Sequence, residues 1–311
     1  MILTVTLNPS IDISYPLEHL QVDDVNRIKN VGRTAGGKGL NVSRVVNELG
    51  EDVLATGFVG GHYGEELKHL LDGNQISHDF TAIAGDTREC IAILHDGGNQ
   101  TEILEAGPTI TAEEQAAFMK NFTRLIEKAD VVAMSGSLPQ GLKPSFYAEL
   151  IALCHEKGVK ALLDTSNASL EASIHAKDKP YLIKPNESEL EALLGKSITN
   201  GDELKQCLES DLLSTIECVV VSLGKGGALG KFGNRYFKAN IPTLDNVVNP
   251  VGSGDSTIAG FAVAIQKGLG PEDIMKYGMT CGMLNALEEK TGHINVDNFK
   301  ALYDQIDIQE V

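Results

Sequence analysis

The chain has 311 residues, of which 42% are hydrophobic and 22% charged, and this composition excludes a disordered or fibrous protein. Its length suits two ordinary domains or one large α/β domain. The formal net charge is −17, which excludes nucleic acid and anionic membranes as general partners, because both are bound through lysine and arginine. A small phosphorylated ligand remains compatible with this charge if a few cations gather locally.

The cysteines and the first residues bear on cellular location. Five cysteines stand at irregular intervals without a CxxC pair, which is typical of reduced thiols in a cytoplasmic protein. The opening MILTVTLNPS lacks the basic and apolar regions of a signal peptide. No apolar run approaches the ~18 residues of a membrane span. We therefore expect a cytoplasmic protein without a membrane segment.

Short apolar runs alternate with longer amphipathic stretches along the chain. The apolar runs are continuous, as in strands covered on both faces, and they predict strands at Ile2–Leu7, Val53–Val59, Asp130–Met134, Ala161–Asp164, Tyr181–Ile183 and Cys218–Ser222. The amphipathic stretches predict helices at Leu40–Leu49, Gly64–Leu71, Ala112–Lys128, Ser145–Lys157, Glu187–Leu194, Asp202–Leu213, Ser256–Lys267, Pro271–Glu289 and Val296–Gln305. Repeated βα units predict an α/β fold with a mainly parallel sheet and helices on both faces, in one domain over residues 1–311.

Two regions break this pattern, at about residues 13–34 and 88–105. The first is too long for a βα loop and alternates in character over Asn26–Val31. The second holds two alternating runs, Glu89–Leu94 and Gln100–Glu105, joined by a Gly-rich turn that predicts a hairpin. We expect the two regions to form a small antiparallel sheet outside the main layer. It is either a lid over a site or an extension of the sheet edge, and long insertions favour the lid.

The strongest motif is NPVGSGD, which precedes a predicted helix. Its small residues Gly252, Ser253 and Gly254 let the backbone expose N–H groups at a helix N-terminus, which predicts an anion site. Asp255 is unusual there because a carboxylate repels a bound anion. It either caps the helix or acts as a base on a hydroxyl that attacks a bound phosphoryl group.

A second glycine-rich motif, AGGKGLN, nearly fits a P-loop. Gly39 stands where the P-loop requires the serine or threonine that holds Mg²⁺, so we reject a P-loop. The glycines either let the backbone approach a sugar, with Lys38 and Asn41 as donors, or simply form a turn. A dinucleotide fingerprint is also absent, since the first predicted strand leads into Asn8-Pro9-Ser10.

A third motif, KPNESE, follows a predicted strand. Asn186 and Glu189 are three residues apart and share a helix face. They either cap the helix or order Mg²⁺ through water, since this ion keeps several of its waters.

AGGKGLN, KPNESE and NPVGSGD occur in the order found in the ribokinase (PfkB) family of carbohydrate kinases, and the chain resembles that family from Met1 to about Tyr303. The resemblance implies a ribokinase-like, three-layer αβα fold with a small β lid. It also implies a kinase that uses ATP and Mg²⁺ and whose lids pair in a homodimer, with no nucleic acid or membrane as partner.

Within the family, TLNPSIDISY and SGSLPQG resemble the phosphosugar branch, and TAGGKGLNVSRV and QTEILEAGP are most similar to tagatose-6-phosphate kinases. The resemblance thus implies phosphorylation of D-tagatose 6-phosphate to the 1,6-bisphosphate, in lactose and galactose catabolism. The alternatives are a 1-phosphofructokinase or a 6-phosphofructokinase and, more distantly, a non-catalytic sugar-phosphate sensor or a dehydrogenase.

The resemblance also implies a role for each matching position. Asp255 would deprotonate the C1 hydroxyl, while the amides of Gly252, Ser253 and Gly254 stabilise the transferred group. The sugar side comprises Asp12, Gly37, Lys38 and Asn41, with Arg27, Arg88 and Ser137 near the sugar phosphate. The ATP side comprises Lys184, Asn186, Ser222, Gly224, Gly227 and Asn285, and Asn186 and Glu189 would help to place Mg²⁺ through water.

Overall fold

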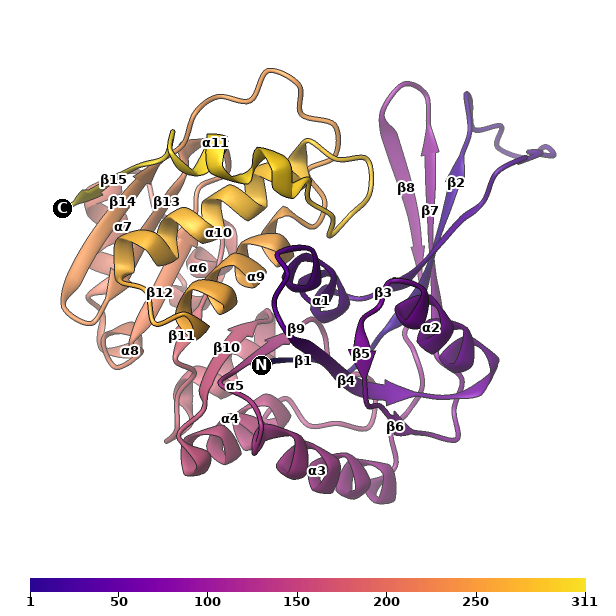
Figure 1. Ribbon diagram of the computed structural model, residues 1–311, viewed down its shortest axis with the longest axis horizontal. Helices are drawn as coiled ribbons and strands as arrows, with labels where there is room; N and C mark the ends of the chain where they lie inside the picture. Colours follow the sequence, from indigo (N-terminus) through magenta and orange to yellow (C-terminus); the bar gives the residue numbers. More distant parts are fainter.

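A parallel sheet runs through the middle of the computed structural model, which describes residues 1–311 (Figure 1). The full strand order is β15-β14-β13-β12-β11-β10-β9-β1-β4-β5, and a short strand, β6 (Thr81–Ala82), also pairs with β4. The parallel strands are β1 (Ile2–Thr6), β4 (Val53–Val59), β5 (Ser77–His78), β9 (Val131–Ser135), β10 (Lys160–Asp164), β11 (Leu182–Ile183) and β12 (Cys218–Ser222). Every strand predicted from an apolar run is confirmed.

Apolar side chains leave this sheet on both faces and form two cores. Neighbouring residues of one strand separate between them: Val131 belongs to one core and Val132 to the other. This alternation is the period-two geometry of a strand. A sheet buried on both faces therefore explains why the strand sequences are continuously apolar.

Helices cover both faces, as predicted, and none is both long and apolar enough to cross a membrane. One face carries α1 (Lys38–Glu48), α2 (Gly61–Gly73), α9 (Ser253–Gln266), α10 (Pro271–Ala286) and α11 (Phe299–Tyr303). The other carries α3 (Ala112–Ile126), α4 (Phe146–Lys157), α5 (Asn167–His175), α6 (Glu187–Leu194), α7 (Gly201–Leu208) and α8 (Asp211–Ser214). Two 3₁₀ turns, η1 (Gly224–Gly226) and η2 (Val296–Asn298), complete the set.

Three helix predictions need correction, and helix α5 was not predicted. The predicted helix Val296–Gln305 is the 3₁₀ turn η2 followed by the short helix α11. The predicted helix Asp202–Leu213 is two helices, because Ser210 takes an extended ψ of 151° and ends the hydrogen-bond ladder. The predicted helix Ser256–Lys267 begins at Ser253, because Gly252, with φ 84°, is its left-handed N-cap. The motif residues Ser253, Gly254 and Asp255 therefore form the first turn of α9.

Three antiparallel strands at the sheet edge were not predicted: β13 (Ala228–Phe232), β14 (Arg235–Asn240) and β15 (Asp307–Glu310). A buried lysine disguises β13, because Lys231 is only 2% exposed. Its ammonium donates to the carbonyls of Leu213, Ser214 and Ile216 at 3.2, 3.0 and 2.5 Å. These carbonyls come from α8 and the turn after it, so only the tertiary structure satisfies this charge.

A second, four-stranded sheet projects from the body (Figure 1), and we call it the outer sheet. Its order is β3-β2-β7-β8, with β2 (Ser10–Pro16), β3 (Gly32–Gly36), β7 (Arg88–His95) and β8 (Asn99–Leu104). The predicted hairpin is confirmed as β7–β8. The pairing of β2 with β7 is parallel, so the sheet is mixed and not antiparallel as predicted.

The alternating segment Asn26–Val31 is not a strand. Most of residues 17–31 are exposed, so this segment has no buried face that an alternating strand would pack against the core. The strands of the first insertion are β2 and β3, on either side of this segment.

The order of the parallel strands fixes where a site can form. β1 pairs with β4 on one side and with β9 on the other, so the direction of winding reverses at β1. Loops that leave the carboxyl ends of neighbouring strands diverge at such a point and leave a crevice.

Candidate active site

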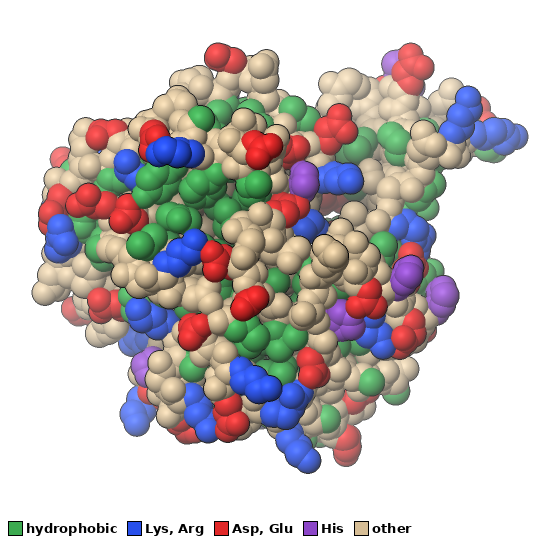
Figure 2. All heavy atoms as spheres, viewed as in Figure 1, with side chains coloured by type: hydrophobic (Ala, Val, Ile, Leu, Met, Phe, Trp, Pro, Cys, Tyr) green, Lys and Arg blue, Asp and Glu red, His purple; other side chains and the backbone are tan.

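A cleft of about 1310 Å³ lies at this edge of the sheet, between the body and the outer sheet (Figure 2). Strand ends supply part of its lining, namely Thr6, Ser135, Asp164, Lys184 and Ser222. Only 8 of its 44 lining residues are hydrophobic, which suits polar ligands. The volume exceeds the ~300–1,000 Å³ of an ordinary ligand pocket, so two small molecules have room to lie side by side.

Asp255 lies in this cleft, in the first turn of α9, and is 6% exposed. No side chain caps this helix, so the capping interpretation does not describe the geometry. The Oδ2 atom of Asp255 accepts a hydrogen bond of 2.8 Å from Nδ2 of Asn41, on α1. The structure thus joins the two glycine-rich motifs through one contact.

Burial, and then the nearby carboxylate of Asp164, raise the pKa of Asp255 to about 7. The hydrogen bond from Asn41 and the charges of Lys38 and Lys184 act in the opposite direction. A carboxyl that titrates near neutrality can both take up and release a proton at physiological pH, which is the property of a general base.

Sequence reasoning missed Asp164, a second buried carboxylate of the site. It ends β10, is 5% exposed, and lies 3.6 Å from Lys38 Nζ and 3.7 Å from Lys184 Nζ. The attraction of Asp164 is the main cause that raises the pKa of Lys38. A strand that ends in a polar residue is the only sequence signal for it. The cluster shows that cations do gather inside this acidic protein.

The anion site at the start of α9 differs in one detail from the prediction. The amides of Gly252 and Gly254 have no hydrogen-bond partner in the chain, whereas the Ser253 amide donates to Pro250 O at 3.2 Å. A turn closed by this bond leaves two of the three predicted donors available. A Cβ atom on Gly254 would lie 3.2 Å from Lys184 Nζ, so this ammonium lies close to the backbone of Gly254.

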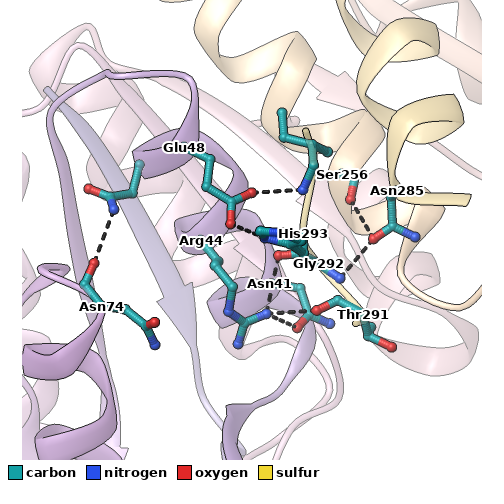
Figure 3. Close-up of polar contacts among 11 residues, drawn as sticks. Asn41, Arg44, Glu48, Asn74, Ser256, Asn285, Thr291, Gly292 and His293 are labelled. Carbon is teal, nitrogen blue, oxygen red and sulfur yellow. Dashed lines mark hydrogen bonds and ion pairs between the residues drawn. The ribbon is translucent and has the colours of Figure 1, made fainter. Parts of the chain in front are cut away.

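Asn285 supports the anion site from behind and does not line the cleft. Its Oδ1 atom accepts from Ser256 Oγ at 3.1 Å and from the Gly292 amide at 2.7 Å (Figure 3). Its Nδ2 atom donates to Val251 O at 2.9 Å. The side chain of Asn285 is fully buried with its polar atoms engaged, so this structure does not bring it to the cleft, where ATP was predicted to contact it.

The predicted sugar residues meet at the outer-sheet side of the cleft. Asp12 is half-buried, its partial burial is the main cause that raises its pKa, and it accepts a bond of 2.6 Å from Ser10 Oγ. A Cβ atom on Gly36 would lie 2.0 Å from this carboxyl group, so a larger residue there would displace the Asp12 carboxyl group. Arg88 donates to Asn8 O at 3.0 Å and to Glu105 O at 2.8 Å. Gly37, Lys38, Asn41 and Ser137 line the same cleft.

Other predicted residues lie outside the cleft. Arg27 is exposed in the segment between β2 and β3 and does not line the cleft, although Asn30 and Val31 of the same segment do. Gly224 and Gly227 lie in and after η1 and do not line the cleft, although Ser222 does. These three residues are not brought to the site in this structure.

Asn186 and Glu189 line the cleft, and they also form a reciprocal cap of α6. Asn186 Oδ1 accepts from the Glu189 amide at 2.8 Å, and Glu189 Oε2 accepts from the Asn186 amide at 2.9 Å. No group of three or more His, Cys, Asp or Glu side chains could hold a metal ion. The cap engages Glu189 Oε2 and leaves the other oxygen of Glu189 without a hydrogen-bond partner in the chain.

Arg44 is a further cleft residue that sequence reasoning missed. It follows Asn41 by three residues on α1, so the two side chains share a face of the helix. Arg44 Nη1 donates to Asn41 Oδ1 at 3.1 Å (Figure 3). The signal was the helical spacing itself, which identifies a neighbour of Asn41 but not its contacts.

Known structures resemble the whole chain. A "putative phosphofructokinase" from Staphylococcus aureus is 31% identical, with a TM-score of 0.85 and coverage of 100% of this chain and 99% of that one. Phosphofructokinase-2 from Escherichia coli in complex with potassium is 26% identical, with a TM-score of 0.91 and coverage of 97% and 98%. A "possible 1-phosphofructokinase" from Thermotoga maritima is 27% identical, with a TM-score of 0.90 and coverage of 100% and 99%.

A family model described as pfkB family carbohydrate kinase matches residues 5–298. This match spans the outer sheet, the cleft and the first turn of α9. The chain therefore belongs to the pfkB family of carbohydrate kinases.

Proposed function

We propose that this protein transfers the γ-phosphoryl group of ATP to a hydroxyl of a sugar that already carries a phosphate. The observation that supports this most directly is Asp255, a buried carboxyl with a pKa of about 7. It shares the first turn of α9 with an available amide, that of Gly254. A base and an anion site in one turn suit transfer of a phosphoryl group to an alcohol.

A few residues of the cleft suffice for the proton transfer and the phosphoryl transfer. Asp255 takes the proton of the attacking hydroxyl, whose oxygen forms the new bond to phosphorus while the bond to the leaving ADP oxygen breaks. The amides of Gly252 and Gly254 and the ammonium of Lys184 stabilise the charge on the transferred group. The proton is released to water when product leaves.

MgATP supplies the phosphoryl group, and the residues of the cleft fit it. Lys184 and the two available amides are donors for phosphate oxygens, and Ser222 lines the same side. Mg²⁺ keeps several waters and needs few protein ligands, so the second oxygen of Glu189, acting through water, suffices. Asn186 contributes by holding Glu189 in the cap.

The sugar lies on the other side of Asp255, under the outer sheet. Asp12 and Asn41 offer an acceptor and a donor for hydroxyls, and Arg88 and Lys38 are cations for its phosphate. The outer sheet acts as a lid that excludes water and so limits hydrolysis of ATP. We propose D-tagatose 6-phosphate as the preferred sugar, because the motif sequences resemble that group most.

A phosphofructokinase is the second candidate. It is favoured by the three structural relatives, whose names all describe phosphofructokinases. A non-catalytic sensor is disfavoured because the base is present in a formed cleft.

We also propose a homodimer through the outer sheet. Its edge strand β8 exposes Ile103 and Leu104 by 56% and 60%, and apolar edge strands are normally covered. Phosphofructokinase-2 of E. coli, a structural relative, is described as a tetramer in its inhibited form.

The substrate assignment predicts a ranking. With MgATP, kcat/KM for tagatose 6-phosphate should exceed that for fructose 6-phosphate and fructose 1-phosphate by on the order of tenfold, because the sugars differ in hydroxyl placement. Steady-state rates for the three sugars, measured side by side, give this ratio. A higher kcat/KM for fructose 1-phosphate would replace the proposed sugar but leave the phosphoryl-transfer mechanism in place. No turnover with any of the three sugars would contradict the kinase proposal.

The Asp255→Asn variant should lose turnover by a factor of roughly 10² or more, because the base is removed while the shape is kept. Sugar binding, measured by calorimetry, should remain close to that of the wild type. The matched control is Asp304→Asn, an exposed residue that pairs only with Lys300. Near-normal turnover in Asp255→Asn would remove Asp255 from the reaction.

The Arg88→Ala variant should raise KM for phosphorylated sugars about tenfold or more, because a charged contact to phosphate is lost. The control is Arg33→Ala on β3, an arginine that pairs with Glu66 and Glu89 and does not line the cleft. Initial rates over a range of sugar concentrations separate KM from kcat. An unchanged KM would exclude Arg88 from the phosphate site.

A further inference from the structure

The guanidinium of Arg44 is a partly buried cation held by neutral acceptors. Nη1 donates to Thr291 O at 2.9 Å and to Gly292 O at 3.2 Å, and Nη2 donates to Ala35 O at 2.8 Å. No carboxylate lies within 4.0 Å of it as an ion-pair partner. A charge that gives up its hydration without a direct counter-ion is costly, so its position calls for an explanation.

The fourth contact, from Nη1 to Asn41 Oδ1 at 3.1 Å, decides which way the Asn41 amide faces. With the oxygen held by Arg44, the Nδ2 group must point to Asp255 Oδ2, where it donates. A donor stabilises the ionised carboxylate, whereas a flipped amide would present its oxygen and favour the protonated acid. The orientation of one amide thus selects the form in which Asp255 is a base.

Arg44 also contacts the loop that holds Gly292, which leads through Asn285 toward the anion site (Figure 3). The backbone that it binds, at Gly292, donates its amide to Asn285 Oδ1 at 2.7 Å. Asn285 in turn donates to Val251 O, in the loop that precedes α9. The Arg44 side chain is therefore linked to the first turn of α9 by two routes, through Asn41 to Asp255 and through Gly292 and Asn285 to Val251.

The charged groups around this network are few. Asp164, Lys38 and Lys184 act on Asp255 from β10, α1 and the end of β11. Glu48, Asp12 and Asp255 attract Arg44, while burial lowers the pKa of its guanidinium. Glu48 itself is held by His293 and by the Ile294 amide.

We propose that Arg44 is a positioning residue that locks the Asn41 amide toward Asp255 and thereby stabilises the ionised form of Asp255 that acts as the base. The inference rests on the proposed function, because it gives Asp255 the role of the base. It assigns to Arg44 no contact with substrate.

The test follows Asp255 by its effect on stability, without any ligand. Because the pKa of Asp255 is raised in the folded state, the folded protein binds more protons, and stability falls as pH rises from the unfolded to the folded pKa. Above the folded pKa the loss is complete. Denaturant unfolding of wild type and Asp255→Asn, from about pH 5 to 9, therefore shows a break at the folded pKa of Asp255.

In an Arg44→Met background this break should move upward by on the order of 0.5 to 1 pH unit, because the amide is free to turn. In an Asn41→Ala background, adding Arg44→Met should leave the pH of the break unchanged. Arg44 can then no longer act on Asp255 through the Asn41 amide. Arg124→Met, on the remote helix α3, should leave the break in place. An unmoved break in Arg44→Met, or an equal shift with and without Asn41, would overturn the proposal.

Two further measurements keep the test decisive. If Arg44→Met does not fold, Arg44→Lys keeps the charge without the planar fork. The Arg44→Lys variant should still move the break in the stability curve to a higher pH. A break at the wild-type pH in this variant would overturn the proposal. In the active enzyme, the pH at which kcat falls on the acidic side of its pH profile should move upward by the same amount. If no phosphoryl transfer is found at all, the proposed function fails, while the unfolding result still decides the role of Arg44.

Discussion

The burial of one carboxyl group, Asp255, is the constraint on which the rest of the site depends. Removing an isolated carboxylate from water is costly unless its surroundings replace the lost hydrogen bonds and charge. The chain supplies an amide from Asn41 and ammonium groups from Lys38 and Lys184, and opposes them with Asp164. The balance leaves the pKa of Asp255 at about 7, so neither the acid nor the base form dominates strongly at physiological pH.

The fold makes this balance possible because its topology brings distant segments to one edge. β10 ends in Asp164 and β11 is followed by Lys184, and these strands are neighbours in the parallel sheet. The reversal of winding at β1 opens the crevice, and α1 and α9 converge on it from one face of the sheet. The outer sheet then closes the side on which we place the sugar.

Much of this could be predicted from the sequence because the signals are local. Continuous apolar runs identified the strands of the parallel sheet except the two-residue strands β5 and β6. The glycine-rich motifs identified the two helix starts that meet at Asp255. The glycines at the start of α9 predicted available backbone N–H groups, and those of Gly252 and Gly254 are available. The Ser253 amide is not, because it donates to Pro250 O. Glycine is needed at Gly252 because of its positive φ and because a Cβ atom would lie 2.5 Å from Thr291.

What could not be predicted depends on contacts between segments far apart in the chain. Lys231 looked unlike a strand residue because its three carbonyl partners lie 15 to 18 residues earlier. Arg44 had no visible role because most of its acceptors belong to β3 and to a loop about 250 residues away. Arg27 was placed near the phosphate by resemblance, whereas it is exposed and does not line the cleft in this structure.

The most direct test of the central claim is to titrate the carboxyl carbon of Asp255 by ¹³C NMR in the ligand-free protein. The Asp255→Asn variant identifies the signal, because that resonance should disappear from its spectrum. The account predicts a titration midpoint of about 7, since burial and Asp164 outweigh the nearby cations. A midpoint near the ordinary aspartate value of about 4 would contradict it, because the carboxylate would then be too weak a base for the proposed proton transfer.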